Sequence, residues 1–157
     1  MKKTNAVRGL DRAGIPYRLI EYDFDEDDLG AGAVSKKTGF PLERIFKTLV
    51  VRGEKTDIFF AVIPGDAELD LKSAAALTGN KSCDLVHLKE VQPLTGYQRG
   101  GVSPLGAKRP FPVLFDESAL FYDEICVSAG LRGLQVVIDP RRLIEAAHGT
   151  VGPLSRR

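Results

Sequence analysis

The stretch Ile45-Phe46-Lys47-Thr48-Leu49-Val50-Val51 is followed, after residues 52–57, by Ile58-Phe59-Phe60-Ala61-Val62-Ile63. β-Branched and aromatic residues make up most of both stretches, a composition typical of strands. The connection between them is short and mostly polar, as in a β-hairpin. The sequence therefore predicts a hairpin over residues 45–63.

Cap and turn residues on either side of this hairpin place the other elements. Thr4 and Asp70 are favoured N-cap residues, and Gly14, Gly39 and Gly79 stand where helices would end. The pattern predicts helices over residues 5–13, 31–38, 71–78, 87–94 and 141–147, and further strands over residues 17–22, 113–115, 120–127 and 134–138. Because no regular strand–helix–strand rhythm is present, the expected fold class is mixed α/β (α+β), with a curled, partly barrel-like central sheet and surrounding helices.

Length and composition limit the class of protein. The chain of 157 residues suffices for a single domain, residues 1–157, and its hydrophobic fraction of 43% is high enough for a buried core. The net charge of +1 does not favour a DNA-coating protein. The basic start lacks the apolar segment of a secretory signal, and no apolar run is long enough to cross a membrane. We therefore expect a cytoplasmic protein without a membrane partner.

Several familiar catalytic signatures are absent from the sequence. It has no GxSxG, P-loop, HExxH or GxGxxG motif, and its two histidines are His87 and His148. The two cysteines, Cys83 and Cys126, form no CxxC pair, so neither a zinc site nor a disulfide framework is predicted. A Ser-His-Asp or Cys-His centre stays open, since its members need only meet in space.

Lys47 is the charged residue inside the first predicted strand. Alternation along a strand places Lys47 on the same apolar face as Ile45 and Leu49. A lysine there either extends its ammonium to solvent, which the pattern alone favours, or serves as a fixed cation for a carbonyl or phosphate oxygen. Thr48, on the other face, either packs or donates a hydrogen bond.

Two glycine-containing segments are candidate functional loops. Residues 96–106 read Gly-Tyr-Gln-Arg-Gly-Gly-Val-Ser-Pro-Leu-Gly. Such a loop can present amide N–H groups to an oxyanion, or it can be a plain connection. Residues 128–133, Ser-Ala-Gly-Leu-Arg-Gly, are interpreted as a hairpin loop. Arg132 in that loop can bind phosphate or face solvent.

Three segments together resemble one family. Residues 46–51, 95–106 and 127–133 are similar, in order and spacing, to the YbaK/EbsC family of Cys-tRNA(Pro) deacylases. The string Gly-Tyr-x-x-Gly-Gly-x-Ser-Pro-x-Gly at residues 96–106 is the most specific of the three. The resemblance covers the chain from the first predicted helix to about residue 147. It implies the mixed, partly barrel-like fold of the editing domain inserted in bacterial prolyl-tRNA synthetases.

The resemblance also implies roles for individual residues. Lys47 matches the family's essential lysine, which holds the aminoacyl-adenosine end of the substrate. Gly100 and Gly101 match the glycines beside the substrate carbonyl, and the N–H groups near them are expected to bind the oxyanion. The positions that match substrate-binding pocket residues are Tyr22, Leu29, Thr48, Ser128 and Gln135.

The sequence departs from its relatives at three positions. Leu29 stands where close relatives often have phenylalanine, so one wall of the pocket differs. Gln135 stands where some relatives have aspartate, and Leu131 replaces a frequent lysine that can contact RNA. These departures bear on the choice of amino acid more than on the fold.

The reaction implied by the resemblance removes cysteine wrongly attached to proline tRNA. A synthetase pocket separates cysteine from proline poorly because their volumes are similar, so a second site edits the product. The substrate's own thiol attacks its ester carbonyl, closes a thiolactone ring and expels the tRNA hydroxyl. No metal or organic cofactor is implied.

The implied partners are the 3′ end of tRNA(Pro) and prolyl-tRNA synthetase. Two alternatives stay open. The first is deacylation of Ala-tRNA(Pro) by an activated water, which the charged amino acid would reveal because alanine has no thiol. The second is a non-catalytic module that binds an aminoacyl end or a synthetase.

Overall fold

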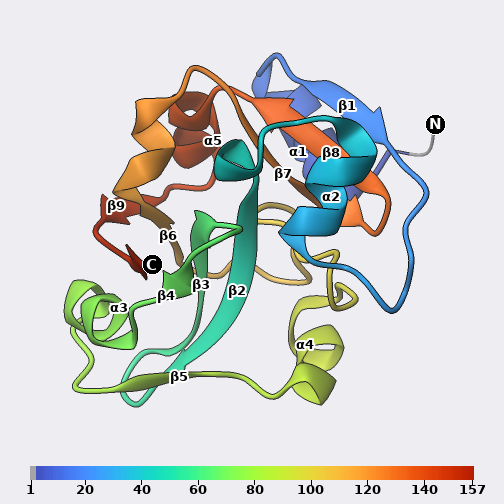
Figure 1. The fold of residues 1–157 in the computed structure, drawn as a ribbon. Coiled ribbons are helices and arrows are strands. Elements are labelled where there is room, and N and C mark those ends of the chain that lie inside the picture. The colour runs from blue at the N-terminus through green and yellow to red at the C-terminus, as the bar shows by residue number, and fades with distance from the viewer. Residues whose placement is uncertain (1–2) are drawn as a thin grey trace.

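The computed structural model describes residues 3–157, and Met1 and Lys2, at the basic start considered for a secretory signal, lie outside the described residues. The strands are β1 (Arg18–Glu21), β2 (Phe46–Gly53), β3 (Asp57–Pro64), β4 (Glu68–Leu69), β5 (Cys83–Leu85), β6 (Val113–Asp116), β7 (Ile125–Leu131), β8 (Leu134–Ile138), β9 (Thr150–Gly152) and β10 (Ser155–Arg156). They form three sheets, ordered β5-β2-β3-β6-β9, β1-β8-β7 and β10-β4 (Figure 1). The predicted mixed α/β class is confirmed, and the described strands do not close into a barrel.

The helices follow the predicted cap residues closely. They are α1 (Asn5–Ala13), α2 (Ala31–Thr38), α3 (Leu71–Thr78), α4 (Leu88–Thr95) and α5 (Pro140–Ala146), with 3₁₀ helices Leu42–Arg44 and Glu117–Phe121. Thr4 accepts a hydrogen bond from the Val7 amide, and Asp70 accepts one from the Ser73 amide. These caps satisfy amides that have no partner inside the helix. None of the helices within residues 3–157 is long and apolar enough to span a membrane.

The predicted hairpin lies in the middle of the large sheet. β2 and β3 are antiparallel, with Lys47 opposite Ile63 and Val50 opposite Phe60. Pairing continues to Gly53 opposite Asp57, so the turn is shorter than the predicted connection. β6 then pairs with β3 in parallel.

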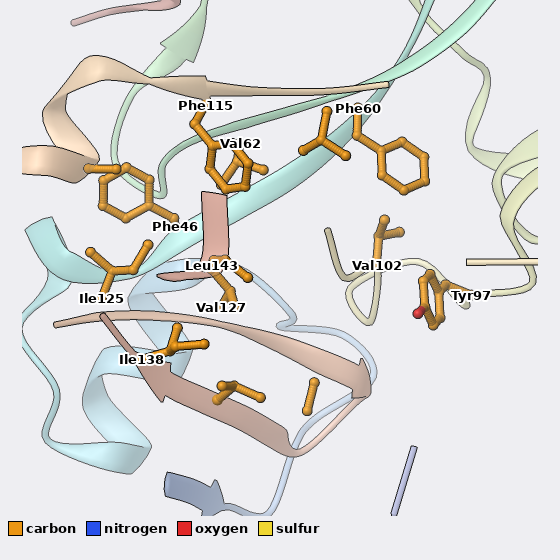
Figure 2. Packing of buried hydrophobic residues seen from close by; sticks show 14 of the residues in the cluster. Phe46, Phe60, Val62, Tyr97, Val102, Phe115, Ile125, Val127, Ile138 and Leu143 are labelled. Carbon is orange, nitrogen blue, oxygen red and sulfur yellow. The ribbon is translucent and has the colours of Figure 1, made fainter. Parts of the chain in front are cut away.

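Both faces of the hairpin are buried. Phe60 and Val62 belong to the main core cluster, and Phe59, Ala61 and Ile63 belong to a second cluster. Figure 2 shows the main cluster, in which side chains of the large sheet meet those of β7 and β8; the labelled members include Phe46, Phe60, Val62, Phe115, Ile125, Val127 and Ile138. Tyr97 and Val102 lie at one end of this cluster (Figure 2). The glycine-rich segment is thereby attached to the core.

The strand predicted over residues 120–127 is wrong in its first half. Leu120 and Phe121 lie in the 3₁₀ helix Glu117–Phe121, and β7 begins only at Ile125. The cause is Asp116, whose carboxylate accepts hydrogen bonds from the amide and hydroxyl of Ser118 and so starts the helical turn. Local capping here overrides the strand propensity of the side chains that follow.

The hairpin loop predicted over residues 128–133 is also shorter than expected. β7 runs through Leu131, which pairs with Leu134, so the turn consists of Arg132 and Gly133. An irregularity between Ser128 and Leu131 absorbs the extra residues, with Gly130 at φ +102°. Ser128 is therefore held in a strand and not in a loop.

Candidate active site

One edge of β2 is only partly covered, and the candidate site lies along it. β5 pairs with β2 only from Val51 to Gly53, and a single bridge joins Ile45 to Cys126 of β7. Residues 47–49 have no strand on that side within the described part of the chain. A cavity of about 370 Å³ is lined by residues 45–50 of this edge, and its volume is typical of small-molecule sites.

The walls of the cavity are mostly apolar. Leu29, Val34 and Val91, from three different parts of the chain, are among the lining residues. Lys47 and Arg99 are the charged ones, and no histidine, cysteine, aspartate or glutamate lines the cavity. The cavity is therefore apolar with a positive rim, and its lining offers no carboxylate or imidazole as a base.

Lys47 is half-buried in the cavity wall. No carboxylate of residues 3–157 lies within 4.0 Å of its ammonium. A cation in an apolar wall without an acidic partner is suited to bind a carbonyl or phosphate oxygen.

Thr48 is the lining residue with an unmet hydrogen-bonding group. Its Oγ1 is buried and has no partner within residues 3–157. A buried hydroxyl without a partner costs about 1–3 kcal/mol. The cost is removed if a bound molecule supplies the missing partner, so Thr48 is a second group that points to a ligand.

The glycine-rich segment supplies a tight turn at the cavity. The Gly101 amide donates to the Gln98 carbonyl at 2.9 Å, and Gly100 has φ +83°. This combination describes a type II β-turn, whose third residue requires a positive φ. A Cβ on Gly100 would lie 3.0 Å from the Leu29 side chain, so a larger residue would also crowd the cavity wall.

Gly100 and Gly101 are placed differently by this turn. Gly100 lines the cavity, whereas Gly101 does not. Because the Gly101 amide is already bonded to Gln98, it is not available for a substrate oxyanion in this geometry. A donor role for amides near Gly100 stays a prediction, whereas the Gly101 amide closes the turn.

Ser128 ties the turn to β7. Its Oγ donates to the Gly101 carbonyl at 3.0 Å and accepts from the Gly130 amide at 3.1 Å. The serine is 8% exposed and lines the cavity. With both hydrogen bonds made, the hydroxyl serves as a link between two backbone segments and has no adjacent base to activate it.

Gln135 lines the cavity and connects it to Tyr22. Its Nε2 donates to the Tyr22 hydroxyl at 3.4 Å, and its Oε1 accepts from the Cys126 thiol at 3.3 Å. Tyr22 does not itself line the cavity, but it is bonded to Gln135 and packs against the cluster that contains the lining residues Val34 and Ile45. Burial raises the pKa of the Cys126 thiol to about 12. Cys126 is therefore a neutral hydrogen-bond donor and not a nucleophile.

Comparison with known proteins assigns this site to a family. The family described as aminoacyl-tRNA editing domain matches residues 28–154. The chain belongs to the aminoacyl-tRNA editing domain family. The match covers the cavity wall from Leu29 to Gln135, including Lys47 and the glycine turn. The family resemblance drawn from the sequence is confirmed.

Two relatives match this editing domain over nearly their whole length, and a third matches it over a small part of a longer chain. The editing domain is 42% identical, over 99% of the chain and 95% of the relative, to EbsC of Enterococcus faecalis, which is named as a proposed Cys-tRNA(Pro)/Cys-tRNA(Cys) deacylase. A crystal structure of a proposed trans-editing enzyme for prolyl-tRNA synthetase superimposes with a TM-score of 0.84 at 27% identity, covering 100% of both chains. The proline–tRNA ligase of Ralstonia pickettii is 29% identical over 62% of this chain and 18% of the ligase.

Some residues of the site were missed by sequence reasoning. Arg99, Leu85 and Leu88 line the cavity of the editing domain. Arg99 had a local signal, since it directly precedes the two glycines, but the leucines are placed only by tertiary structure. His87 precedes α4, where its amide donates to Glu90, and neither it nor His148 lines the cavity. No group of three or more metal-ligating side chains is found among residues 3–157.

Proposed function

We propose that this protein releases cysteine from mischarged Cys-tRNA(Pro), acting in trans on the product of prolyl-tRNA synthetase. The observation that carries the proposal is the composition of the cavity lining. It contains Lys47, the Thr48 hydroxyl without a hydrogen-bond partner and the glycine turn, but no cysteine, histidine or carboxylate. Such a cavity can orient an ester and stabilise an oxyanion. Its lining supplies no carboxylate or imidazole to activate a hydroxyl or a water, so in this proposal the nucleophile comes from the substrate.

The proposed reaction is an intramolecular displacement. The thiolate of the cysteinyl group attacks its own ester carbonyl, so that a carbon–sulfur bond forms. Collapse of the tetrahedral intermediate breaks the ester carbon–oxygen bond, and the ribose oxygen leaves with the proton that came from the thiol. The products are free tRNA and a cysteine thiolactone, which water then hydrolyses to cysteine. The protein contributes orientation, exclusion of water and charge stabilisation.

Three groups have roles in this proposal. The Gly100 amide donates to the oxyanion, because the Gly101 amide is held by Gln98. Lys47 binds an oxygen of the terminal adenosine or of the ester with its unpaired ammonium. The Thr48 hydroxyl, which has no protein partner, bonds to the substrate. The cavity that these three groups line has a volume of about 370 Å³, so it can hold the aminoacyl end of the substrate but not a whole tRNA.

The partner and extent of the active unit are part of the proposal. The likeness to proline–tRNA ligases supports prolyl-tRNA synthetase as the enzyme whose product is edited, in the cytoplasm where tRNA is charged. We also infer that residues 1–157 act as one editing domain. In support, β1 pairs with β8, and Thr4 Oγ1 donates to the carbonyl of Ala129, next to Ser128.

The test uses tRNA(Pro) charged with cysteine, S-methylcysteine, serine or alanine. We expect wild type to release cysteine rapidly and the other three amino acids slowly or not at all, because only cysteine carries a thiol. Lys47→Ala should lose this activity. Lys55→Ala is the matched control, since Lys55 is exposed in the β2–β3 turn, at the other end of the hairpin.

Each other outcome decides against the proposal. Release of alanine or S-methylcysteine at the rate of cysteine would show that water, and not the substrate thiol, is the nucleophile. Binding of charged tRNA or synthetase without release of any amino acid would identify a non-catalytic module.

A further inference from the structure

The orientation of one peptide in the glycine turn decides whether the Gly100 amide can serve as a donor. Type I and type II turns differ mainly by rotation of the central peptide through about 180°. In the turn from Gln98 to Gly101 this is the peptide between Arg99 and Gly100. Rotation to type I would replace the Gly100 N–H at the cavity with the Arg99 carbonyl, which repels an oxyanion.

Arg132 holds this peptide in the type II orientation. Its Nε donates to the Arg99 carbonyl at 2.8 Å. In a planar trans peptide the carbonyl and the N–H point in opposite directions. The Arg99 carbonyl is therefore directed towards Arg132 and the β7–β8 turn, and the Gly100 N–H is directed away from them. Gly100 itself lines the cavity together with Leu29.

Arg132 lies in the tight turn between β7 and β8, against which the glycine turn packs. Arg132 and Gly133 form the two-residue turn between paired Leu131 and Leu134. The glycine turn packs directly against this backbone, since a Cβ on Gly101 would lie 3.3 Å from the Arg132 nitrogen. Ser128, on the same hairpin, donates to a second carbonyl of this segment, that of Gly101. The carbonyls of Arg99 and Gly101, on either side of Gly100, are thus both bonded to one hairpin.

Arg132 has no acidic partner among residues 3–157 that would compete for its guanidinium. It is half-buried, and its guanidinium makes no ion pair with a carboxylate of residues 3–157. We infer that Arg132 is a positioning residue for deacylation: by bonding to the Arg99 carbonyl it keeps the Gly100 N–H available to the substrate oxyanion. The inference rests on the proposed function for its catalytic consequence, but its structural part can be measured independently.

The test compares wild type, Arg132→Ala and Arg132→Lys, with Arg142→Ala as a control for loss of charge, since Arg142 is exposed on α5. Single-turnover release of cysteine is measured at increasing enzyme concentration, which separates the limiting rate from half-saturation. The ¹⁵N–¹H NMR signal of the Gly100 amide reports the peptide orientation in the same variants.

Loss of one oxyanion donor costs about 10²–10³ in rate. We expect Arg132→Ala to lower the limiting rate by at least about tenfold. The effect is smaller than complete loss of the donor, because some molecules keep the type II orientation without the arginine. The enzyme concentration that gives half the limiting rate should stay within about twofold of wild type, because Arg132 itself touches no substrate. Arg132→Lys keeps a donor and should restore most of the rate, and Arg142→Ala should behave as wild type. The Gly100 signal should shift or broaden in Arg132→Ala only.

Three results would overturn the inference. An unchanged limiting rate and Gly100 signal in Arg132→Ala would show that the turn keeps its orientation without the arginine. A higher enzyme concentration at half-saturation, with an unchanged limiting rate, would show that Arg132 contacts the RNA. If wild type releases no cysteine, the proposed function fails, and the Gly100 signal alone then decides: an unchanged signal in Arg132→Ala overturns the positioning role as well.

Discussion

Ser128 and Gly101, separated by 27 residues in the chain, are joined by a hydrogen bond of 3.0 Å from the serine Oγ to the glycine carbonyl. The same oxygen accepts from the Gly130 amide. The Ser128 hydroxyl thus donates to one backbone group and accepts from another. Its contribution is to the shape of the turn that borders the cavity.

Ser128→Ala should therefore weaken the turn without abolishing deacylation. We expect the free energy of unfolding to fall by about 1 kcal/mol, the usual value of a neutral hydrogen bond. Denaturant unfolding measures this loss. Mass spectrometry of wild type quenched during turnover should find no acyl group on the protein. An acyl adduct on Ser128 would show instead that the serine is a nucleophile.

Thr48→Val should separate stability from substrate binding. The buried Oγ1 has no partner within residues 3–157, so its replacement by a methyl group removes a cost and no protein hydrogen bond. We expect a gain of up to about 1 kcal/mol in the free energy of unfolding, together with a weaker half-saturation for charged tRNA. Thermal unfolding and single-turnover kinetics measure the two effects. A loss of stability would mean that the hydroxyl bonds within the protein.

The cysteines should be inert in the folded protein. Burial raises the pKa of Cys126 to about 12 and also raises the pKa of Cys83 above its ordinary 9.0. Ellman's reagent at pH 8 should react with both thiols only after unfolding. Fast reaction of one thiol in the native protein would contradict this prediction.

The same shift predicts a pH dependence of stability. The folded state retains the Cys126 proton, whereas the unfolded chain releases it near pH 9, its ordinary pKa. The stabilisation is complete below pH 9 and is lost as the pH rises from 9 towards 12, by at most about 1.4 kcal/mol per pH unit. Denaturant unfolding of wild type and Cys126→Ala between pH 8 and 10.5 should give a steeper decline for wild type. Equal slopes would contradict the shift.

Asp116 should be a large contributor to stability. Its Oδ1 accepts hydrogen bonds from the amides of Leu154 at 2.8 Å and Ser155 at 3.0 Å, and the residue is 4% exposed. Asp116→Ala leaves the buried Leu154 amide without a partner, so we expect a loss of about 3 kcal/mol. Asp139, which caps α5 at the surface, is the matched control, and Asp139→Ala should cost about 1 kcal/mol. Equal losses would show that burial of Asp116 does not matter.

Helices and the central hairpin were predictable because their determinants are local. Thr4 and Asp70 bond to amides three residues ahead, and apolar residues in β2 and β3 follow each other along the chain. β4, β5, β9 and β10 were missed, since they are two or three residues long and exist only through their partners. The failure over residues 120–127 has the same origin, because the side chain of Asp116 ends the preceding strand.

The candidate site was predictable where the resemblance carried it, and less so where backbone bonds decide. Lys47, Thr48, Gly100, Ser128 and Gln135 do meet at one cavity. The direction of the Gly100 amide depends on the turn type, whereas the Gly101 amide closes the turn in both types. The sequence left two roles open for Arg132, a phosphate contact or a solvent-facing side chain. Its actual partner, the Arg99 carbonyl, is 33 residues away in the sequence and is therefore not visible in the local pattern.

The partly uncovered edge of β2 is also relevant to aggregation of this protein. Unpaired strand edges add strands from neighbouring molecules and so promote aggregation. Here the open stretch is confined to residues 47–49, between the pairing with β5 and the bridge from Ile45 to Cys126. Three residues can pair with only a short strand, because β5 and the bridge to Cys126 limit the open stretch on either side. At this edge the protein therefore offers a neighbouring molecule a pairing segment of three residues only.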